Sequence, residues 1–388
     1  MITTFRIESF KSIESAELAL GTVNVFIGAN GSGKSNLLEA FAVLAAAAFG
    51  RVDLESLVRR GCRPGGYYQP LFPGGQLDAE IKILAAGNGV SYCVSLANPM
   101  RQRPAGWEFR REVLKNGEHK LVDRETRTDT GKGDPQAGLA ALRLAEMSVE
   151  SEAAVFLRTL AAYSIYAPDT PVLRGWTQDP QLREPVGLSG GRLADAVAEL
   201  QKQEGGSKLG NQFSAGVEWF GGFGIVESAP PAQHTPKRAI AFIDRFFRTD
   251  NEALYLLNSS DVNEGSLYLL FVDVLCLHKA APKLFALDNA DHGLNPIIAK
   301  NLMRTMCQWL LGAKEERQVL LTTQNPMALD GLPLQDDRVR LFTVDRNNRG
   351  GSTIRRLVIT EELQKKASEG WPLSRLWVNG LIGGVPNV

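Results

Sequence analysis

The sequence predicts an α/β protein built around one mixed sheet. Near its start, the short β-branched run 23–27 ends in a glycine-rich stretch, and the Leu/Ala/Glu-rich segment 36–49 follows. The last third repeats the order strand, helix, strand, with apolar runs at 284–287 and 319–323 on either side of a helical segment at 297–311. Short apolar runs that alternate with helical segments are typical of buried strands with helices packed on the sheet.

The chain has 388 residues, enough for two or three domains. Because strand–helix units lie at both ends, we expect one domain assembled from the two ends, with the middle inserted. The predicted parts are an N-terminal lobe over 1–135, an inserted, largely helical subdomain over 136–258 and a C-terminal lobe over 259–388. Other expected elements are strands at 3–13, 77–84, 90–96 and 107–114, helices at 137–162 and 192–203, loops at 204–212 and 227–236, and hairpins over 239–257 and 339–358.

Composition excludes several classes of protein. Lysine plus arginine balances aspartate plus glutamate at 43 each, which excludes a generally basic, histone-like binder but permits a local basic patch. The four cysteines, Cys62, Cys93, Cys276 and Cys307, have neither zinc-site nor disulfide spacing. The first residues lack the apolar core of a signal peptide, and the most apolar run, 40–50, is about half the length that crosses a bilayer. We therefore expect a soluble, cytoplasmic protein with buried thiols and no membrane contact.

The strongest motif is GANGSGKS, at residues 28–35. It fits the pattern G-x-x-x-x-G-K-[ST] and lies between a predicted strand and a predicted helix, as a phosphate-binding loop requires. Its glycines allow backbone N–H groups to turn toward phosphates at a helix N-terminus. Lys34 would reach the β- and γ-phosphates, and the Ser35 hydroxyl would be a ligand for Mg²⁺. The residues expected to bind ATP here are Asn30, Gly31, Ser32, Gly33, Lys34, Ser35 and Asn36.

A second motif narrows the class of nucleotide-binding protein. The run LFALD at 284–288 is an apolar strand that ends in an acid, the Walker B pattern, and Asp288 would hold the Mg²⁺ shell opposite Ser35. Asp288 follows Lys34 by 254 positions. An insertion of that length, containing both helices and strands, is typical of ABC-type ATPase heads.

Four tracts resemble the SMC, RecF and OLD-type ATPases. The start, FRIESFKSI…VNVFIGANGSGKSNLLEA, is similar to their opening, LFALDNADHGLNP to their Walker B and D-loop, and TTQNPMALD at 322–330 to their switch tract. NEGSLYLL at 263–270 resembles the signature tract that each subunit offers to its neighbour's ATP. The resemblance covers about residues 1–50 and 255–345. It implies a P-loop NTPase fold of the ABC/SMC-head type and a homodimer, or a higher oligomer, with shared ATP sites completed by Asn263, Glu264, Gly265 and Ser266.

The tract LSGGR at 188–192 also looks like an ABC signature, but its spacing excludes it. A signature helix leads almost directly into the Walker B strand. Gly265 precedes Asp288 by 23 positions, whereas Gly191 precedes it by 97. We interpret 188–192 as a loop and the start of a helix.

Several residues depart from the family pattern at catalytic positions. Where the family has the Walker B glutamate this chain has Asn289, and where it has the switch histidine this chain has Gln324. Amides position a water but cannot take its proton. The loss of a general base lowers the rate of hydrolysis by a factor of about 10²–10⁴. We favour tight binding with slow hydrolysis. In the alternative, Asp291 or Asp288 is the base and turnover is ordinary; Asp291 could also be a turn or helix-cap carboxylate.

The function implied by the resemblance is an ATP switch that controls another protein. The chain lacks heptads for long coiled-coil arms, and only 62 residues follow Pro326, too few for the nuclease domain of OLD proteins. Heads of this form resemble the ATPase subunits of antiphage systems such as PARIS and Septu, which act with a separate nuclease or toxin. The alternative is a DNA-binding repair ATPase of the RecF type.

Two basic features leave nucleic-acid contact open. Arg59, Arg60 and Arg63 lie close in sequence to Tyr67 and Tyr68, which fits either a nucleic-acid contact or a solvated loop, and we favour the loop. Lys11 resembles a residue near the nucleotide in related heads, and an exposed turn lysine is the alternative.

The apolar, glycine-rich tail at 379–388 would dock on a partner or pack on the body.

Overall fold

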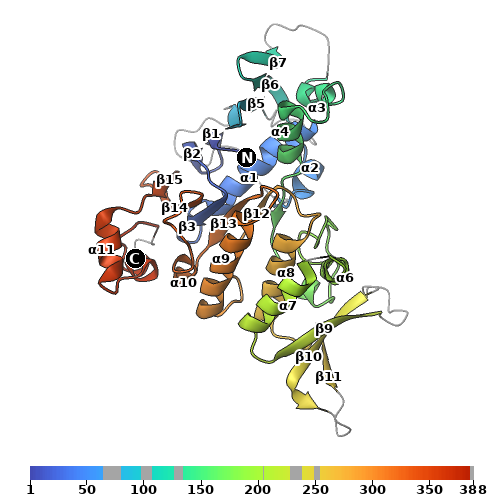
Figure 1. Ribbon diagram of the computed structural model, residues 1–388. Coiled ribbons are helices and arrows are strands. Elements are labelled where there is room, and N and C mark those ends of the chain that lie inside the picture. The colour runs from blue at the N-terminus through green and yellow to red at the C-terminus, as the bar shows by residue number, and fades with distance from the viewer. Residues whose placement is uncertain are drawn as a thin grey trace.

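The computed structural model describes residues 1–63, 80–97, 107–125, 134–203, 205–227, 238–248 and 254–384. Three sheets are present in these ranges (Figure 1). A central sheet lies between an N-terminal antiparallel sheet and a pair of long helices, and a small three-stranded sheet lies at the far end of the molecule.

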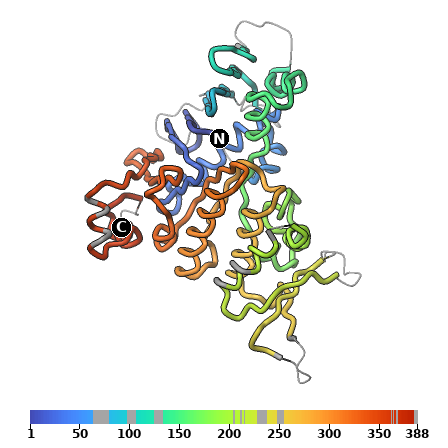
Figure 2. Tube along the Cα trace, viewed as in Figure 1, coloured from blue at the N-terminus to red at the C-terminus, as the bar shows by residue number. Residues whose placement is uncertain are grey.

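The central sheet is mixed and has the strand order β15-β14-β3-β13-β12-β8. β15 runs antiparallel to β14, and the other neighbours are parallel. The strands are β3 (Val23–Ile27), β8 (Ile165–Tyr166), β12 (Leu284–Leu287), β13 (Gln318–Thr323), β14 (Val339–Arg346) and β15 (Ser352–Leu357). Strands from both ends of the chain therefore lie side by side, as the blue and orange segments of Figure 2 show, and the predicted α/β fold is confirmed.

The central sheet separates two hydrophobic cores. Val25 and Ile27 of β3 join one core and Phe26 joins the other, because successive residues of a strand point to opposite faces. β3, β12 and β13 are buried along their whole length, as expected of parallel strands covered on both faces. This burial explains why the sequence shows these strands as short continuous apolar runs.

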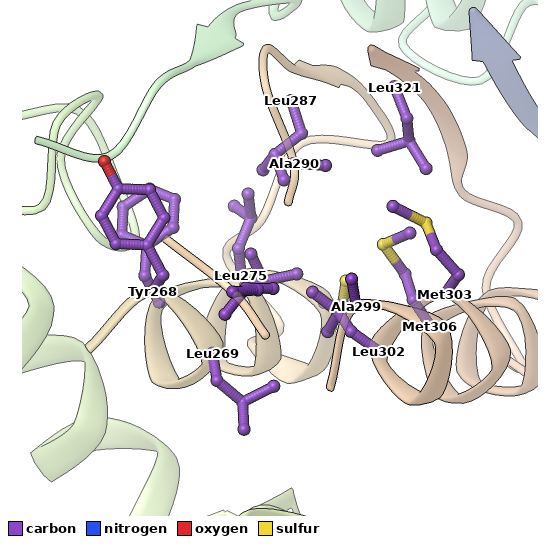
Figure 3. Close-up of a cluster of buried hydrophobic side chains, with 14 of the residues drawn as sticks. Tyr268, Leu269, Leu275, Leu287, Ala290, Ala299, Leu302, Met303, Met306 and Leu321 are labelled. Carbon is purple, nitrogen blue, oxygen red and sulfur yellow. The ribbon is translucent and has the colours of Figure 1, made fainter. Parts of the chain in front are cut away.

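Two long helices, α8 (Glu264–Leu277) and α9 (Pro296–Leu311), cover one face of the central sheet. Figure 3 shows Leu287 and Leu321 above these helices, with Met303 and Met306 of α9 directed toward the sheet. Flexible methionines fill irregular gaps of this kind between a helix and a sheet.

The other face carries α1 (Lys34–Phe49), which is apolar nearly all round and buried from Leu37 to Ala48. A helix that is apolar on every side must be enclosed. α4 (Glu152–Ala161) and α3 (Leu139–Leu144) pack against it, as does the N-terminal sheet.

The N-terminal sheet is antiparallel, with the order β2-β1-β4-β5-β6-β7. Its strands are β1 (Thr4–Phe10), β2 (Ile13–Ala19), β4 (Ile81–Gly87), β5 (Val90–Ala97), β6 (Glu108–Asn116) and β7 (His119–Glu125). Residues 3–13, predicted as one strand, instead form β1, a turn and the start of β2. The chain reverses at Lys11, whose φ of 48° is compatible with a turn and not with a strand. The polar strand β7 was not predicted either.

The middle of the chain combines helices with the small sheet, whose order is β11-β10-β9. Its elements are α5 (Thr170–Leu173), α6 (Leu193–Gln201), α7 (Gly205–Gly216), β9 (Phe220–Glu227), β10 (Arg238–Arg248) and β11 (Leu254–Asn258). Residues 204–212 were predicted as a loop, which is wrong for 205–212. The glycine-rich α7 has low helix propensity, but Leu209 and Phe213 bury its apolar side. The boundaries of the three predicted parts remain a prediction.

Short helices complete the described residues: α2 (Leu54–Val58), α10 (Pro326–Leu329), α11 (Glu361–Ser368) and α12 (Leu373–Val378). The tract LSGGR at 188–192, which looks like an ABC signature, is irregular and precedes α6, as predicted. Cys62, Cys276 and Cys307 are buried, Cys93 is half-buried, and all four are free. In the part of the chain that the structure describes, no helix is both long and apolar enough to cross a membrane.

Candidate nucleotide-binding site

The loop 28–33 joins β3 directly to α1, and three of its glycines serve different purposes. A Cβ on Gly28 would lie 2.2 Å from the Val344 carbonyl oxygen, so only glycine allows β14 to approach. Gly33 begins α1 with φ 111°, a conformation that L side chains rarely adopt. Gly31, with φ 74°, has nothing within 4 Å of a would-be Cβ and so borders open space.

Lys34 is buried within the loop that precedes it. Its Nζ donates to the carbonyl oxygens of Gly28, at 2.7 Å, and Ala29, at 2.9 Å. Burial lowers the pKa of Lys34, and the charges of Asp288 and Asp291 oppose that shift. The ammonium group thus lies close to the Walker B region, where the motif predicts that it meets phosphates.

The predicted Mg²⁺ ligands lie together. Ser35 Oγ donates to Asp288 Oδ2 at 2.8 Å, and Thr322 donates to the other carboxylate oxygen. Thr322 Oγ1 in turn accepts from the backbone N–H of Asn289 at 2.8 Å. Hydroxyl and carboxylate oxygens are the ligands that Mg²⁺ prefers, with phosphate oxygens and water completing its shell. Among the described residues, no cluster of three or more His, Cys, Asp or Glu side chains could hold a metal.

The two amides at the catalytic positions contact each other. Gln324 Nε2 donates to Asn289 Oδ1 at 3.2 Å. Asn289 has φ 52°, in the left-handed region that asparagine tolerates better than most residues. The structure therefore places both residues beside Asp288. Neither amide is basic enough to accept a proton from water.

Asp291 points into the same region. Burial raises the pKa of this carboxyl, while hydrogen bonds from Thr323 and from the backbone of Gln324 and Asn325 oppose that shift. The helix that follows is capped instead by Asn295, whose Oδ1 accepts from Ile297 N at 2.9 Å. Asp291 is thus no cap of α9.

The signature tract begins α8 and packs against the D-loop of its own chain. Asn263 caps the helix, accepting from Ser266 N at 2.8 Å. Glu264 bonds to Thr170 and lies 3.5 Å from His292 Nε2. A Cβ on Gly265 would lie 2.9 Å from the Gly293 carbonyl oxygen, so a glycine is needed here.

Comparison with known proteins shows what this chain is similar to. A family model described as an AAA ATPase domain matches residues 1–85. The chain is 39% identical over 97 residues to the DNA replication and repair protein RecF of Renibacterium salmoninarum, and the match covers 24% of each protein, so the chain spans about a quarter of that relative's length. A crystal structure of an SMC head bound to the C-winged helix domain of ScpA is similar at 13% identity, with TM-score 0.54, over 94% of this chain and 99% of that one.

The chain has the fold of an SMC head. The SMC head domain from Thermotoga maritima is also similar, at TM-score 0.47 and 13% identity, over 92% of this chain and 99% of that one. The phosphate loop and the match of residues 1–85 to an AAA ATPase domain are consistent with this fold.

Asn36 and Lys11 lie in a partly buried polar network beside the phosphate loop. Asn36 Nδ2 donates to Ser12 Oγ at 2.8 Å. Lys11, 4% exposed, pairs with Glu39, which also accepts from Arg63 Nε at 2.8 Å. Burial opposes ionisation of Glu39, but Arg63 and Lys11 outweigh it and lower its pKa. Lys11 is therefore not the exposed turn lysine considered from the sequence. Arg63 pairs with Glu39, and its side chain is 61% exposed, so it is both paired and solvated. Tyr67 and Tyr68 lie outside the described residues.

Residues near the C-terminus contact the phosphate loop, so the described part of the tail packs on the body, which was one of the two alternatives predicted from the sequence. Arg346 Nε donates to the Gly31 carbonyl at 2.9 Å, and a Cβ on Gly384 would lie 3.5 Å from Gly28 Cα. A cavity of about 310 Å³ lies here, lined by Gly28, Ala29, Asn30, Gln324, Pro326, Trp377, Val378 and Gly384. Contacts between residues more than 300 positions apart carry no local sequence signal.

Proposed function

We propose that this chain is an ATP-gated switch. It binds ATP with Mg²⁺, pairs with a second copy around the nucleotide and controls a separate effector protein. The observation that carries the proposal is the Asn289–Gln324 amide pair beside an intact set of Lys34, Ser35 and Asp288. Binding chemistry is retained where the acceptor for the proton of water is missing. ATP is then held for long periods and acts as a clamp.

The loop's residues fit a triphosphate. Gly31 borders open space, and Ser32 Oγ is a buried hydroxyl without a hydrogen-bond partner among the described residues, as expected of a group that contacts a phosphate. Lys34 would exchange its carbonyl contacts for phosphate oxygens. Ser35 and Asp288 would hold Mg²⁺, which neutralises phosphate charge when it is bound.

The sheet order supports a shared ATP site. The phosphate loop follows β3, whereas the signature helix α8 adjoins the ends of β12 and β8, since Tyr268 donates to the carbonyl of Pro168. Strands lie about 4.8 Å apart, so the two elements are separated by two to three spacings, roughly 10–14 Å. One nucleotide phosphate cannot contact both in one head. A two-fold pair of heads would bring each signature to its neighbour's ATP.

A pair of substitutions at Asn263 tests this dimer. Asn263→Asp keeps an equally good helix cap but adds a negative charge that would face the partner's γ-phosphate, so ATP-dependent dimers should be lost. Asn263→Ser, also a good cap and neutral, should dimerise as the wild type does. Light scattering with saturating ATP and Mg²⁺ measures both. A wild-type chain that stays monomeric with ATP and no partner contradicts the homodimer.

Gly265→Arg should also block pairing, because it places a long cation where the partner's nucleotide would lie. Its Cβ would meet the Gly293 carbonyl oxygen at 2.9 Å, so the variant strains its own head as well. Its thermal midpoint must therefore be compared with that of Asn263→Ser before a loss of dimers is assigned to the interface.

The separate effector is proposed from analogy with antiphage systems of the PARIS and Septu type, in which a nuclease or toxin is a second polypeptide. The similar SMC head was solved bound to a domain of another protein, ScpA, so a head of this fold can carry a partner. Affinity purification of the native protein, with and without ATP, followed by mass spectrometry, tests the proposal. We expect one stoichiometric nuclease or toxin; a chain that purifies alone under both conditions contradicts it.

A RecF-like DNA-binding repair ATPase is the second candidate, favoured by the 39% identity to RecF. Such a protein neutralises several phosphates, so its affinity for duplex DNA should fall steeply with salt. Fluorescence anisotropy at increasing salt distinguishes the two. Binding with a steep salt dependence, enhanced by ATP, favours the RecF-like function.

A further inference from the structure

A second cavity lies at the far end of α1 from the phosphate loop. α1 has 16 residues, so its two ends are about 24 Å apart. The cavity has a volume of about 300 Å³, and its walls come from the end of α1, from α2, from the end of α4 and from the segment before α6. The side chains that matter here are Phe49, Arg59, Arg60 and Arg183. No step of the proposed ATP cycle uses them.

Two of the arginines at this cavity have no carboxylate partner in the described part of the chain. Arg60 Nη1 donates to the Ser56 carbonyl at 2.7 Å, and Nη2 to that of Ala161 at 3.2 Å. Arg183 Nη2 donates to the Ala162 carbonyl at 2.7 Å. Neutral carbonyls satisfy single N–H groups but leave the charges uncompensated.

The nearby carboxylates are already engaged with other arginines. Arg51 Nε lies 3.2 Å from Asp53 Oδ2, and Arg59 pairs with Glu55. The four arginines that line the cavity therefore exceed its two carboxylates by two positive charges. The excess belongs to Arg60 and Arg183.

The electrostatics of Arg60 reflect this excess. Burial lowers its pKa to about 10, and the positive charge of Arg183 acts in the same direction. Arg60 is 3% exposed, and its Nε has no acceptor among the described residues. It remains protonated at neutral pH, so two like charges lie at one cavity, and the described residues supply no counter-ion for them.

Capping of α4 explains only part of this arrangement. Ala161 is the last residue of α4 and Ala162 follows it, so both arginines stabilise the carbonyl end of the helix. One cation would be enough for that purpose. A second buried cation beside the first raises the electrostatic energy unless an anion joins them.

We propose that this cavity binds a small phosphate ester, with its phosphate between Arg60 and Arg183. Guanidinium groups match phosphate oxygens in geometry and charge. The volume of about 300 Å³ is at the lower end of small-ligand sites, which suits a monophosphate. Phe49 is 65% exposed at the cavity, and its ring centroid lies 5.1 Å from the Arg60 guanidinium carbon, so it would contact the organic part of the ligand.

Ribose 5-phosphate tests the proposal in the Lys34→Ala background, which removes the main charge of the phosphate loop. Calorimetry should show one saturable site. Arg183→Gln should raise the dissociation constant at least about tenfold, because it removes a charge-assisted bond and keeps a polar group beside Ala162. Arg158→Gln is the matched control: it removes a charge from the exposed side of α4, where Arg158 contacts the Val149 carbonyl and not the cavity. It should leave the affinity unchanged.

The conservative variant Arg183→Lys should recover part of the lost affinity, since it restores the charge without the planar fork. No binding at millimolar ribose 5-phosphate, or binding that Arg183→Gln leaves unchanged, overturns the proposal. A 5′-phosphorylated oligonucleotide that binds through Arg183 more tightly than ribose 5-phosphate overturns it too, because the site would then be a nucleic-acid contact. None of these outcomes depends on whether the phosphate loop binds ATP.

Discussion

Lys34→Ala is expected to abolish ATP binding and to leave the fold intact. Lys34 Nζ is a buried ammonium that donates to the loop carbonyls of Gly28 and Ala29 and would exchange these contacts for the β- and γ-phosphate oxygens. A hydrogen bond between charged groups contributes about 1.5–3 kcal/mol, so losing two or more such bonds weakens binding by more than about 10²-fold. Isothermal calorimetry with ATP and Mg²⁺ measures the loss.

The control for this variant is Lys34→Met, which keeps the length of the side chain and removes its charge. Both variants should lose their affinity for ATP, and circular dichroism should show that their secondary structure is unchanged. If ATP affinity is the same in wild type and Lys34→Ala, the assignment of residues 28–35 as a phosphate loop is wrong.

Asn289→Glu is expected to raise ATP turnover. The new carboxylate would lie beside the Mg²⁺ ligand Asp288 and accept a proton from the attacking water. General-base catalysis contributes about 10²–10⁴-fold. We expect a gain toward the lower end, because residue 289 has φ 52°, where glutamate is less stable than asparagine by about 1–2 kcal/mol. Phosphate release at saturating ATP measures the change.

Asn289→Gln is the matched control, because it has the length of glutamate and meets the same backbone strain but cannot act as a base. It should not raise turnover. The double variant Asn289→Glu with Gln324→His should exceed the sum of its single effects, since residues 289 and 324 contact each other. Fast wild-type turnover that Asn289→Ala leaves unchanged would contradict the missing-base hypothesis, and Asp291→Asn would then be the variant to assay.

The elements that the sequence predicted well are those whose pattern is local. The strand 23–27 and its glycine loop are a continuous stretch, and β12 and β13 are buried on both faces, so their apolar runs are unbroken. α7 was not predicted, because its helix depends on burial of Leu209 and Phe213 rather than on propensity. β7, with the sequence HKLVDRE, is a polar edge strand that has too few apolar positions to show alternation.

The same distinction holds for the site. Ser35 and Asp288 were expected to meet at Mg²⁺ because each belongs to a short motif with a known role, and the structure brings them to 2.8 Å. The contacts of Arg346 and Gly384 with the phosphate loop depend on the packing of β14 and of the chain's last described residues. Neither residue belongs to a motif, so only the folded structure places them.

The position of β3 between β13 and β14 determines the order in which the protein can fold during synthesis. Asn24 of β3 donates to the Val319 carbonyl, a partner 295 positions later. At about 5–20 residues per second, a ribosome needs roughly 15–60 s to make that partner. Through that time the apolar strand that leads into the phosphate loop lacks both of its neighbours in the sheet. Nascent chains should therefore depend on chaperones, and truncation before β13 should leave β3 exposed and prone to aggregate.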